Sequence, residues 1–246
     1  MDIGQQTVLV TGGASGIGLA IAQRFSRAGS TVIICGRQES KLNAVAQNSP
    51  HIRTRVCDLE RESERIALRD WVIREFTRLN VLVNNAGIQR RVQLAEDADW
   101  KAIQQEIVIN FEAQVHLCLL FIPHLSAQQR STIINITSGL SFVPLANVPI
   151  YSATKAALHS FTLSLRHQLK NTSIDVIEIA PPAVNTDLGG PGLHDFGVPL
   201  DEFADVMEER LKRGDSQITY QFSERSSQAS PQELEEIFAR MNQGPQ

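Results

Sequence analysis

Short runs of apolar residues alternate with longer amphipathic segments along most of the chain. The short runs are rich in β-branched residues and have the length of buried strands. The longer segments carry apolar residues at helical spacing. The predicted strands are residues 7–10, 31–35, 52–57, 81–83, 132–137 and 173–179, and the predicted helices are residues 17–28, 39–47, 62–77, 98–124 and 151–170. This alternation predicts an α/β fold with a doubly wound parallel sheet.

The C-terminal part departs from this regular alternation. In order, we predict a glycine-rich mobile loop at residues 187–199, a helix at 200–213, an edge strand at 217–223, a loose polar segment at 223–230 and a short amphipathic helix at 231–241. We therefore divide the chain into one domain, residues 1–222, and a C-terminal tail, residues 223–246. Three placements are open for the tail: over the site, on a partner subunit, or free in solvent.

Composition and charge narrow the class of protein. With 246 residues, 42% of them hydrophobic, the chain is long enough for one substantial core. Its net charge of −4 gives no basic surface, which argues against a nucleic-acid partner. The chain begins without a basic leader, and its apolar run at residues 117–122 is far shorter than the roughly 20 residues of a membrane span. We expect no membrane span and no metal site.

Three cysteines, Cys35, Cys57 and Cys118, lie in apolar settings. An odd number of such residues is typical of buried thiols in a reducing compartment, so we expect a cytoplasmic protein. Cys35 and Cys57 end predicted strands and are candidates for a redox pair, although inert burial is the favoured interpretation.

The first predicted strand runs into TGGASGIG, residues 11–18, and a helix begins within this run. Glycines at positions 12, 16 and 18 allow a tight turn, a close approach to a diphosphate and close packing of the helix on the sheet. The helix N-terminus offers free amides and a positive dipole end to phosphates. The alternative is a tight turn alone, but the place between strand and helix favours a Rossmann-type dinucleotide site.

A second motif, Tyr151-x-x-x-Lys155, opens the last of the alternating helices. Side chains four residues apart project from the same face of a helix, about 6 Å apart along its axis. A phenol has a free pKa of about 10, and a nearby ammonium lowers that pKa towards neutrality, which suits acid-base catalysis. Ser138 follows a predicted buried strand and is placed to hydrogen-bond the same reacting oxygen. Taken alone, the motif also fits an ordinary exposed pair.

Together these motifs resemble the classical type of the short-chain dehydrogenase/reductase family. The resemblance runs from about residue 5 to 222 and rests on the glycine pattern, on Asn84-Asn85-Ala86-Gly87, on Asn110, on Ser138 and on Tyr151-x-x-x-Lys155. The segments NNAGIQRR, residues 84–91, and LHSFTLSLRH, residues 158–167, are similar to the bacterial oxidoreductases called DltE-like. The resemblance implies hydride transfer between a nicotinamide cofactor and a carbonyl or secondary alcohol of a small molecule.

The resemblance assigns four catalytic residues. Tyr151 acts as the general acid in carbonyl reduction, and Lys155 lowers its pKa and holds the nicotinamide ribose. Ser138 orients the substrate carbonyl. Asn110 holds a water that links Lys155 to solvent, and its alternative role is that of an interior helix residue satisfied by the backbone.

The resemblance also implies the cofactor contacts. The residues concerned are Gly12, Ser15, Gly16, Ile17, Gly18, Arg37, Asp58, Leu59, Asn84, Ala86, Gly87, Tyr151, Lys155, Val184 and Thr186. Two of these assignments have alternatives: Asp58 as a cap of the following helix, and the Asn84 turn as a brace for the sheet. Pro182 stands where relatives usually have glycine, which stiffens the turn before Val184.

The end of the second predicted strand bears on cofactor choice. A carboxylate there would bind the adenosine ribose and repel a 2′-phosphate, but this chain has Cys35-Gly36-Arg37. Arginine suits a phosphate through its bidentate fork, so we favour NADP(H) over NAD(H). Ser15 argues against NADP(H), because NADP-preferring relatives often have a basic residue at this position.

The remaining implications concern the substrate side and assembly. By position, residues 187–213 form a substrate lid, in which His194 is expected to be an exposed loop histidine. Arg90 and Arg91 either steer an anionic substrate or form a solvated pair or an oligomer contact. A homodimer or homotetramer is implied, through helices that include Leu117 and Leu165. The functional alternatives are an NAD-dependent dehydrogenase or epimerase on the same scaffold, and a non-catalytic dinucleotide-binding sensor.

Overall fold

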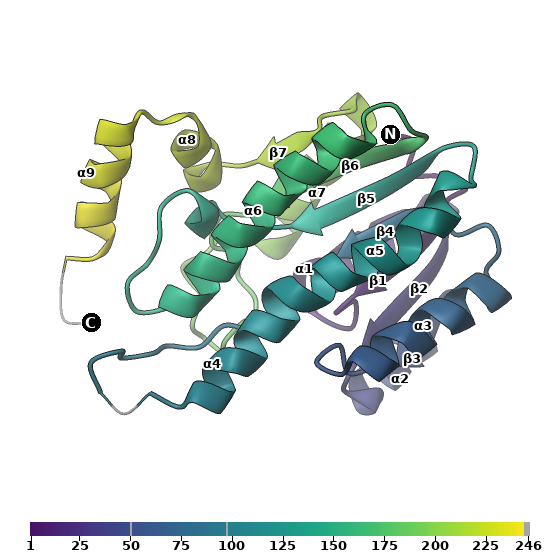
Figure 1. The fold of residues 1–246 in the computed structure, drawn as a ribbon, viewed down its shortest axis with the longest axis horizontal. Helices are drawn as coiled ribbons and strands as arrows, with labels where there is room; N and C mark the ends of the chain where they lie inside the picture. Colours follow the sequence, from purple (N-terminus) through teal and green to yellow (C-terminus); the bar gives the residue numbers. More distant parts are fainter. Residues whose placement is uncertain (50, 97, 244–246) are drawn as a thin grey trace.

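A parallel sheet lies at the centre of the molecule (Figure 1). The computed structural model describes residues 1–49, 51–96 and 98–243, and within them the sheet has seven strands in the order β3-β2-β1-β4-β5-β6-β7. The strands are β1 (Thr7–Thr11), β2 (Thr31–Gly36), β3 (Ile52–Val56), β4 (Val81–Asn84), β5 (Ser131–Ile136), β6 (Ile174–Ala180) and β7 (Gln217–Thr219). The predicted Rossmann-type, doubly wound sheet is confirmed.

Helices cover both faces of the sheet (Figure 1). One face packs against α1 (Gly16–Arg27), α2 (Glu39–Asn48) and α7 (Leu200–Arg213), and the other against α3 (Glu62–Glu75), α5 (Ala113–Ser126) and α6 (Pro149–Leu169). The helix α4 (Trp100–Ile107) leads into α5, while α8 (Phe222–Gln228) and α9 (Pro231–Met241) form the tail. Each crossover helix returns the chain, so the carboxyl ends of the strands share one edge of the sheet.

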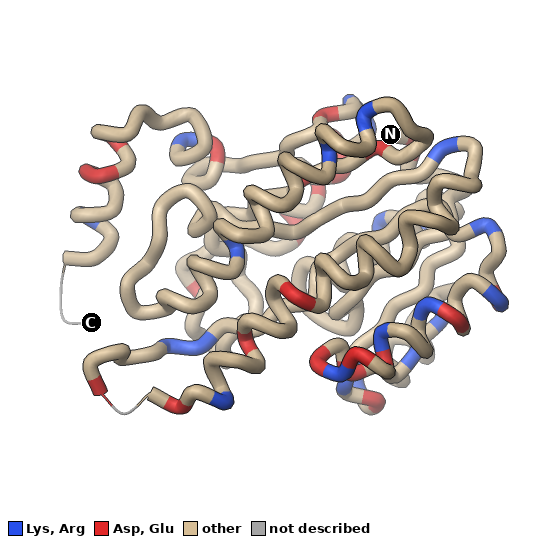
Figure 2. The backbone as a smooth tube through the Cα atoms, viewed as in Figure 1, with Lys and Arg blue, Asp and Glu red and all other residues tan. Residues whose placement is uncertain are grey.

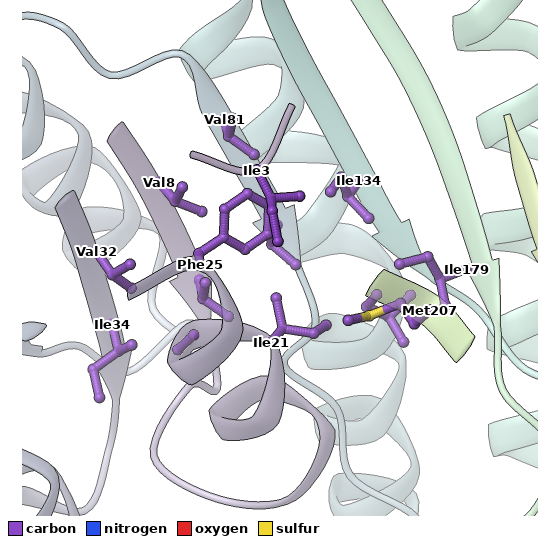
Figure 3. Close-up of a cluster of buried hydrophobic side chains, with 14 of the residues drawn as sticks. Ile3, Val8, Ile21, Phe25, Val32, Ile34, Val81, Ile134, Ile179 and Met207 are labelled. Carbon is purple, nitrogen blue, oxygen red and sulfur yellow. The ribbon is translucent and has the colours of Figure 1, made fainter. Parts of the chain in front are cut away.

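Alternate residues of each strand enter the two halves of the core, because successive side chains point to opposite faces. Val8 and Val10 of β1 join the cluster under α1, whereas Leu9 joins the cluster on the other face. Figure 3 shows Ile21 and Phe25 of α1 packed against the first of these clusters. Strands buried on both faces explain the continuous apolar runs in the sequence.

The order of the strands reverses direction between β1 and β4, since the chain first builds outwards to β3 and then crosses to the other side. In such sheets a ligand crevice forms outside the carboxyl ends of the strands at this switch point. Thr11 ends β1 and Asn84 ends β4, so the glycine turn and the Asn84–Gly87 turn lie on the two sides of the switch point.

The predicted helix 98–124 is interrupted by a π-helical turn at Val108–Glu112, between α4 and α5. Such turns insert an extra residue into a helix and are frequent at functional sites. The whole stretch Trp100–Ser126 is long and apolar enough to span a membrane by length and composition alone. Its residues Leu117, Phe121 and Leu125 are fully buried against the sheet, as in a core helix.

The C-terminal part differs from the prediction in two respects. The edge strand predicted at residues 217–223 is shorter, because β7 ends at Thr219. Residues 223–230 were expected to be loose, but most of them belong to α8, which begins at Phe222. The reason is a tertiary contact: a Cβ atom added at Gly139 would lie 2.8 Å from Cδ1 of the Phe222 ring. Further along, the Asn242 side chain accepts a hydrogen bond from the Ala146 N–H at 2.7 Å. The tail therefore docks on its own chain, beside the start of α6.

Charge is spread unevenly over the helices (Figure 2). Lysine, arginine and acidic residues intermingle on α2 and α3, whereas α5 carries none of them and α6 carries only Lys155 and Arg166. On this sparsely charged part of the surface, Leu119 and Leu163 are exposed. The three cysteines are buried and free.

Candidate active site

The turn after β1 is held against the turn after β4 by two side chains. The Thr11 hydroxyl accepts hydrogen bonds from the backbone N–H groups of Asn85 and Ala86, both at 3.0 Å. The Asn85 amide donates to the carbonyl oxygens of Thr11 at 2.9 Å and Gly12 at 3.3 Å. Sequence reasoning missed these roles of Thr11 and Asn85, which fix the two loops at the switch point.

The glycines of this turn are required by its geometry. Gly12 has φ +63°, and a Cβ atom there would lie 2.9 Å from the Ala86 Cα. Gly16 has φ +52°, and its added Cβ would lie 3.4 Å from the Thr186 methyl group. Both conformations belong to the left-handed region that glycine adopts readily. Thr186, predicted to contact the nicotinamide end of the cofactor, therefore lies beside the glycine turn.

The start of α1 leaves donors free for an anion. Its first helical hydrogen bond runs from the Leu19 N–H to the Ser15 carbonyl oxygen at 3.1 Å, so the earlier amides, including those of Gly16 and Ile17, have no partner within the helix. The Ser15 side chain makes no capping bond, and the first turn carries no acidic residue. The positive dipole end is therefore unopposed. This turn fits a diphosphate.

At the adenosine end, the structure places Arg37 in an exposed position directly after β2. Asp58 is half-buried, and its side chain accepts a hydrogen bond from the Glu60 N–H at 3.2 Å. Because α3 begins at Glu62 and Arg61 is its N-cap residue, Asp58 does not cap this helix, and the capping alternative is wrong. The Leu59 side chain is buried in the core. The glycine turn and the exposed Arg37 are compatible with a nicotinamide dinucleotide along this edge of the sheet.

Ser138, Tyr151 and Lys155 meet at the carboxyl end of β5. Ser138 begins the 3₁₀ turn Gly139–Ser141, and its hydroxyl accepts a hydrogen bond from the Leu140 N–H at 3.1 Å. The first two turns of α6 carry Tyr151 and Lys155, both buried. The Lys155 ammonium lies 5.6 Å from the centre of the Tyr151 ring and donates to the Ile136 carbonyl oxygen at 2.7 Å.

Burial controls the pKa of the phenol. It raises the pKa of Tyr151 to about 12, although a hydrogen bond with Ser138 lowers it. The prediction that Lys155 brings this pKa towards neutrality is therefore wrong for this structure. Desolvation also lowers the pKa of Lys155 to about 8, and its ammonium is directed at a backbone carbonyl rather than at the phenol. At neutral pH the Tyr151 hydroxyl is a proton donor.

Asn110 lies within the π-helical turn and is fully buried. Its side-chain oxygen accepts from the Ile88 N–H at 2.8 Å, and its amide donates to the Ile88 carbonyl oxygen at 2.8 Å and to the Thr154 hydroxyl at 3.3 Å. These bonds correspond to the backbone-satisfied alternative. Asn110 thus ties the segment after β4 to α6, next to Lys155, whose Nζ would lie 3.8 Å from a Cβ atom added at Gly87.

Asn84 faces the interior of the sheet. Its amide donates to the Asn135 side-chain oxygen of β5 at 2.9 Å and to the Cys118 sulfur of α5 at 3.2 Å. Since the residue is fully buried, its side chain braces β4 against β5. Ala86 and Gly87, which follow it, are partly exposed, and Gly87 lies close to the Asn110 and Lys155 side chains.

A buried carboxylate supports the strand end that carries Ser138. Glu178 of β6 is fully buried and accepts hydrogen bonds from the Thr137 hydroxyl at 2.7 Å and from the Gln217 amide at 3.1 Å, while His159 Nδ1 lies 2.8 Å away. Thr137 directly precedes Ser138. Sequence reasoning missed this network, because it joins four segments that are distant in the sequence.

A second buried carboxylate was also missed. Glu106 of α4 is fully buried, and in the described part of the chain neither of its carboxylate oxygens lies within hydrogen-bond distance of a partner, although Arg90 lies near enough to lower its pKa. Its charge raises the pKa of Tyr151. The available sequence signal was its position four residues before Asn110, on the same side of one helix.

The predicted lid consists of two unlike parts. The helix α7 belongs to the core, with Phe203 and Met207 fully buried, and Asp205 of α7 forms a 2.6 Å ion pair with the buried Arg24 of α1. The loop before it contacts the site: Val184 pairs with Val198 in a short parallel bridge, and an added Cβ at Gly189 would lie 3.3 Å from the Gln89 carbonyl oxygen. Only this loop, in which Phe196 is 81% exposed, has the position of a cover.

The structure also shows the surroundings of His194, Arg90 and Arg91, three residues for which the sequence analysis gave expectations. His194 is half-buried rather than exposed, and burial lowers its pKa. Arg90 is neither solvated nor free: its guanidinium donates to the Ala102 carbonyl oxygen at 3.0 Å and to the Gln105 side chain. Arg91 is exposed.

Known proteins with similar sequences and folds agree with this arrangement. A family model described as short chain dehydrogenase matches residues 6–194. An uncharacterized oxidoreductase of Bacillus subtilis, DltE, is 44% identical over 248 residues, which cover 98% of this chain and 98% of the relative.

Solved structures share the fold at low sequence identity. A short chain dehydrogenase from Burkholderia cenocepacia in complex with NADP has a TM-score of 0.85 and 22% identity, with both chains covered completely. A short chain dehydrogenase/reductase from Burkholderia phymatum in complex with NAD has a TM-score of 0.83 and 18% identity, covering 100% of this chain and 99% of the other. From the family model and the relative that matches nearly end to end, this chain belongs to the short-chain dehydrogenase/reductase family of oxidoreductases.

Proposed function

We propose that the protein is an NADP(H)-dependent oxidoreductase that moves a hydride between the nicotinamide and the carbon of a carbonyl or secondary alcohol. The observation that carries the proposal is the buried Tyr151 phenol, close enough to Ser138 for that hydroxyl to lower its pKa and one helical turn from Lys155. In the direction of reduction, Tyr151 donates a proton to the carbonyl oxygen, and Ser138 holds that oxygen by a hydrogen bond.

The cofactor supplies the hydride. Gly12, Gly16 and Gly18, with the amides at the start of α1, would hold its diphosphate, and Lys155 would hold the nicotinamide ribose. Val184 and Thr186 lie on the loop that would contact the carboxamide. Support for a nicotinamide dinucleotide also comes from the structural neighbours, whose solved complexes contain NADP or NAD.

Selectivity for NADP(H) is proposed from Arg37, which is exposed directly after β2, a strand whose last residues, Cys35 and Gly36, are not acidic. Since charge-assisted hydrogen bonds to a phosphate contribute about 1.5–3 kcal/mol, Arg37→Ala is expected to weaken NADPH binding roughly tenfold or more while NADH binding changes little. The measurement is a fluorescence titration of both cofactors. Arg27→Ala, an exposed substitution at the far end of α1, is the control, and equal NADPH affinity in wild type and Arg37→Ala would refute the role of Arg37.

The function itself is tested with a panel of carbonyl compounds and the loss of NADPH absorbance as the readout. Tyr151→Phe is the blank, because it keeps the ring but cannot donate a proton. Turnover in wild type with at least one carbonyl, absent in the variant, supports the proposal. Cofactor binding without turnover of any compound in either direction would favour a non-catalytic sensor.

We further propose that the protein forms a homo-oligomer through α5 and α6. In support, these helices carry few charges, and Leu119 and Leu163 are 60% and 45% exposed. Leu117 and Leu165, which the sequence suggested for this interface, are instead buried in the core. A double substitution, Leu119→Glu with Leu163→Glu, is expected to convert the assembly to monomers in light scattering coupled to size exclusion. The variant Leu94→Glu, at another exposed leucine, should leave the mass unchanged. A monomeric wild type would disprove the proposal.

A further inference from the structure

Glu106 is a buried carboxylate that the proposed chemistry does not use. Its side chain is excluded from solvent, and among the described residues neither oxygen lies within hydrogen-bond distance of a partner. The charge and the backbone N–H of Arg90 lie near enough to lower its pKa, but they offset burial only in part. A buried carboxylate without hydrogen bonds is costly to a fold, because ionisation in a low-dielectric interior is not compensated. The fold keeps this group at such a cost, which raises the question whether its charge acts on the proposed active site.

The packing of two helices brings Glu106 level with Tyr151. The stretch from α4 to α5 and the helix α6 lie side by side and run in the same direction (Figure 1). Their register is fixed by the hydrogen bond from Asn110 to the Thr154 hydroxyl. Glu106 precedes Asn110 by four residues and Tyr151 precedes Thr154 by three, so each lies about one turn before that contact. Glu106 thus faces the first turn of α6.

The charged groups around the pair come from two further segments. Arg90, in the segment after β4, is the cation whose charge lowers the pKa of Glu106. Its guanidinium is already bonded to Ala102 and Gln105. Lys155 of α6 is bonded to the Ile136 carbonyl oxygen. Neither cation forms an ion pair with Glu106 in the described part of the molecule. The negative charge of Glu106 therefore acts on Tyr151 without being neutralised by an ion pair.

We propose that the Glu106 carboxylate is a positioning residue for the proton of Tyr151: its negative charge keeps the phenol protonated and extends carbonyl reduction to higher pH. The inference rests on the proposed function, because the protonated phenol is the form that reduces a carbonyl. No proton passes through Glu106 in this role.

The ionisation of the two groups gives the expected pH dependence. Burial raises the pKa of the Glu106 carboxyl to about 7, an effect that Arg90 only partly offsets, so the charge forms as the pH rises through neutrality. That charge then raises the pKa of Tyr151, in addition to the larger effect of burial. The ionisation of Tyr151 is therefore held at higher pH by Glu106. Because Lys155, with a pKa of about 8, loses its charge first, only the part of the alkaline limb above that pH reports Tyr151.

The test compares Glu106→Gln, which keeps the shape and removes the charge, with Glu112→Gln, an exposed substitution on the same helical stretch. In Glu106→Gln, the alkaline limb of kcat/KM for carbonyl reduction should shift to lower pH by about half a unit or more. Glu112→Gln should keep the limb of wild type. Glu106→Leu removes the charge with another side chain and should give the same shift.

A second readout needs no turnover. The chain has two tyrosines, Tyr151 and Tyr220, so in a Tyr220→Phe background the absorbance of tyrosinate near 295 nm reports Tyr151 alone. Circular dichroism defines the pH range in which each variant is folded. Within it, phenolate should appear at lower pH in Glu106→Gln than in its parent.

The two readouts separate failure of the inference from failure of the function. A tyrosinate shift without carbonyl reduction in any variant would leave the influence of Glu106 on Tyr151 standing and remove the proposed function. An unshifted tyrosinate titration together with an unshifted alkaline limb would overturn the inference. A lower kcat with an unshifted limb would show that Glu106 has a merely structural role.

Discussion

Tyr151→Phe is expected to lower kcat for carbonyl reduction about a thousandfold and to leave cofactor binding nearly unchanged. A positioned general acid contributes typically 10²–10⁴-fold, and the other protonated group nearby, the Lys155 ammonium, is bonded to the Ile136 carbonyl oxygen instead. Burial raises the pKa of the Tyr151 phenol, so its protonated form dominates under assay conditions. The ring itself stays in place, because the substitution removes only the oxygen atom.

Steady-state rates of NADPH oxidation and a fluorescence titration of the cofactor measure the two effects separately. Tyr220→Phe is the matched control, since its hydroxyl bonds Glu202 at 2.8 Å on the surface near α7 and lies outside the site. A Tyr151→Phe protein with wild-type turnover would remove Tyr151 from the reaction and the proposed mechanism with it.

The sequence pattern was sufficient for the sheet because each central strand is buried on both faces. Such strands have to be continuous apolar runs, and helices of known hand must connect them, so β1 to β6 and their crossovers follow from periodicity. The segment that became α8 could not be predicted in this way. It is polar in sequence, and what folds it is the packing of Phe222 on Gly139, a contact across more than eighty residues.

The candidate site was predictable to the extent that spacing determines geometry. Ser138 at a strand end and Tyr151 and Lys155 one turn apart on a helix were expected to meet, and the structure brings them together. The direction of the Tyr151 pKa was not predictable, because it depends on how completely the phenol is desolvated.

Partners drawn from distant segments were also hidden from the sequence. Glu106 has the appearance of an ordinary polar residue of an amphipathic helix, and only the packing of α4 on α6 removes it from water. In the same way, the bond of the Asn85 amide to the glycine turn is set by the alignment of β1 with β4. Motif spacing gives the reacting groups, while tertiary packing gives the groups that tune and hold them.

Gly18→Ala is expected to destabilise the protein by about 2–3 kcal/mol and to weaken cofactor binding at least tenfold. In an open helix this substitution would be favourable, because alanine has the higher helix propensity. Here the added Cβ would lie 2.3 Å from the Asn85 side-chain nitrogen and 2.5 Å from the Gly12 carbonyl oxygen. Both atoms belong to the hydrogen bonds that join the two loops, so relief of the overlap must displace the glycine turn.

Urea denaturation measures the first effect of Gly18→Ala and a cofactor titration the second. Gly36→Ala is the matched control, because a Cβ atom there meets nothing within 4 Å and its φ lies outside the left-handed region. That variant should be unchanged or more stable by up to about 1 kcal/mol, as the unfolded chain loses entropy. If Gly18→Ala were as stable as Gly36→Ala and bound the cofactor normally, the turn would not need the close helix approach on which the diphosphate site depends.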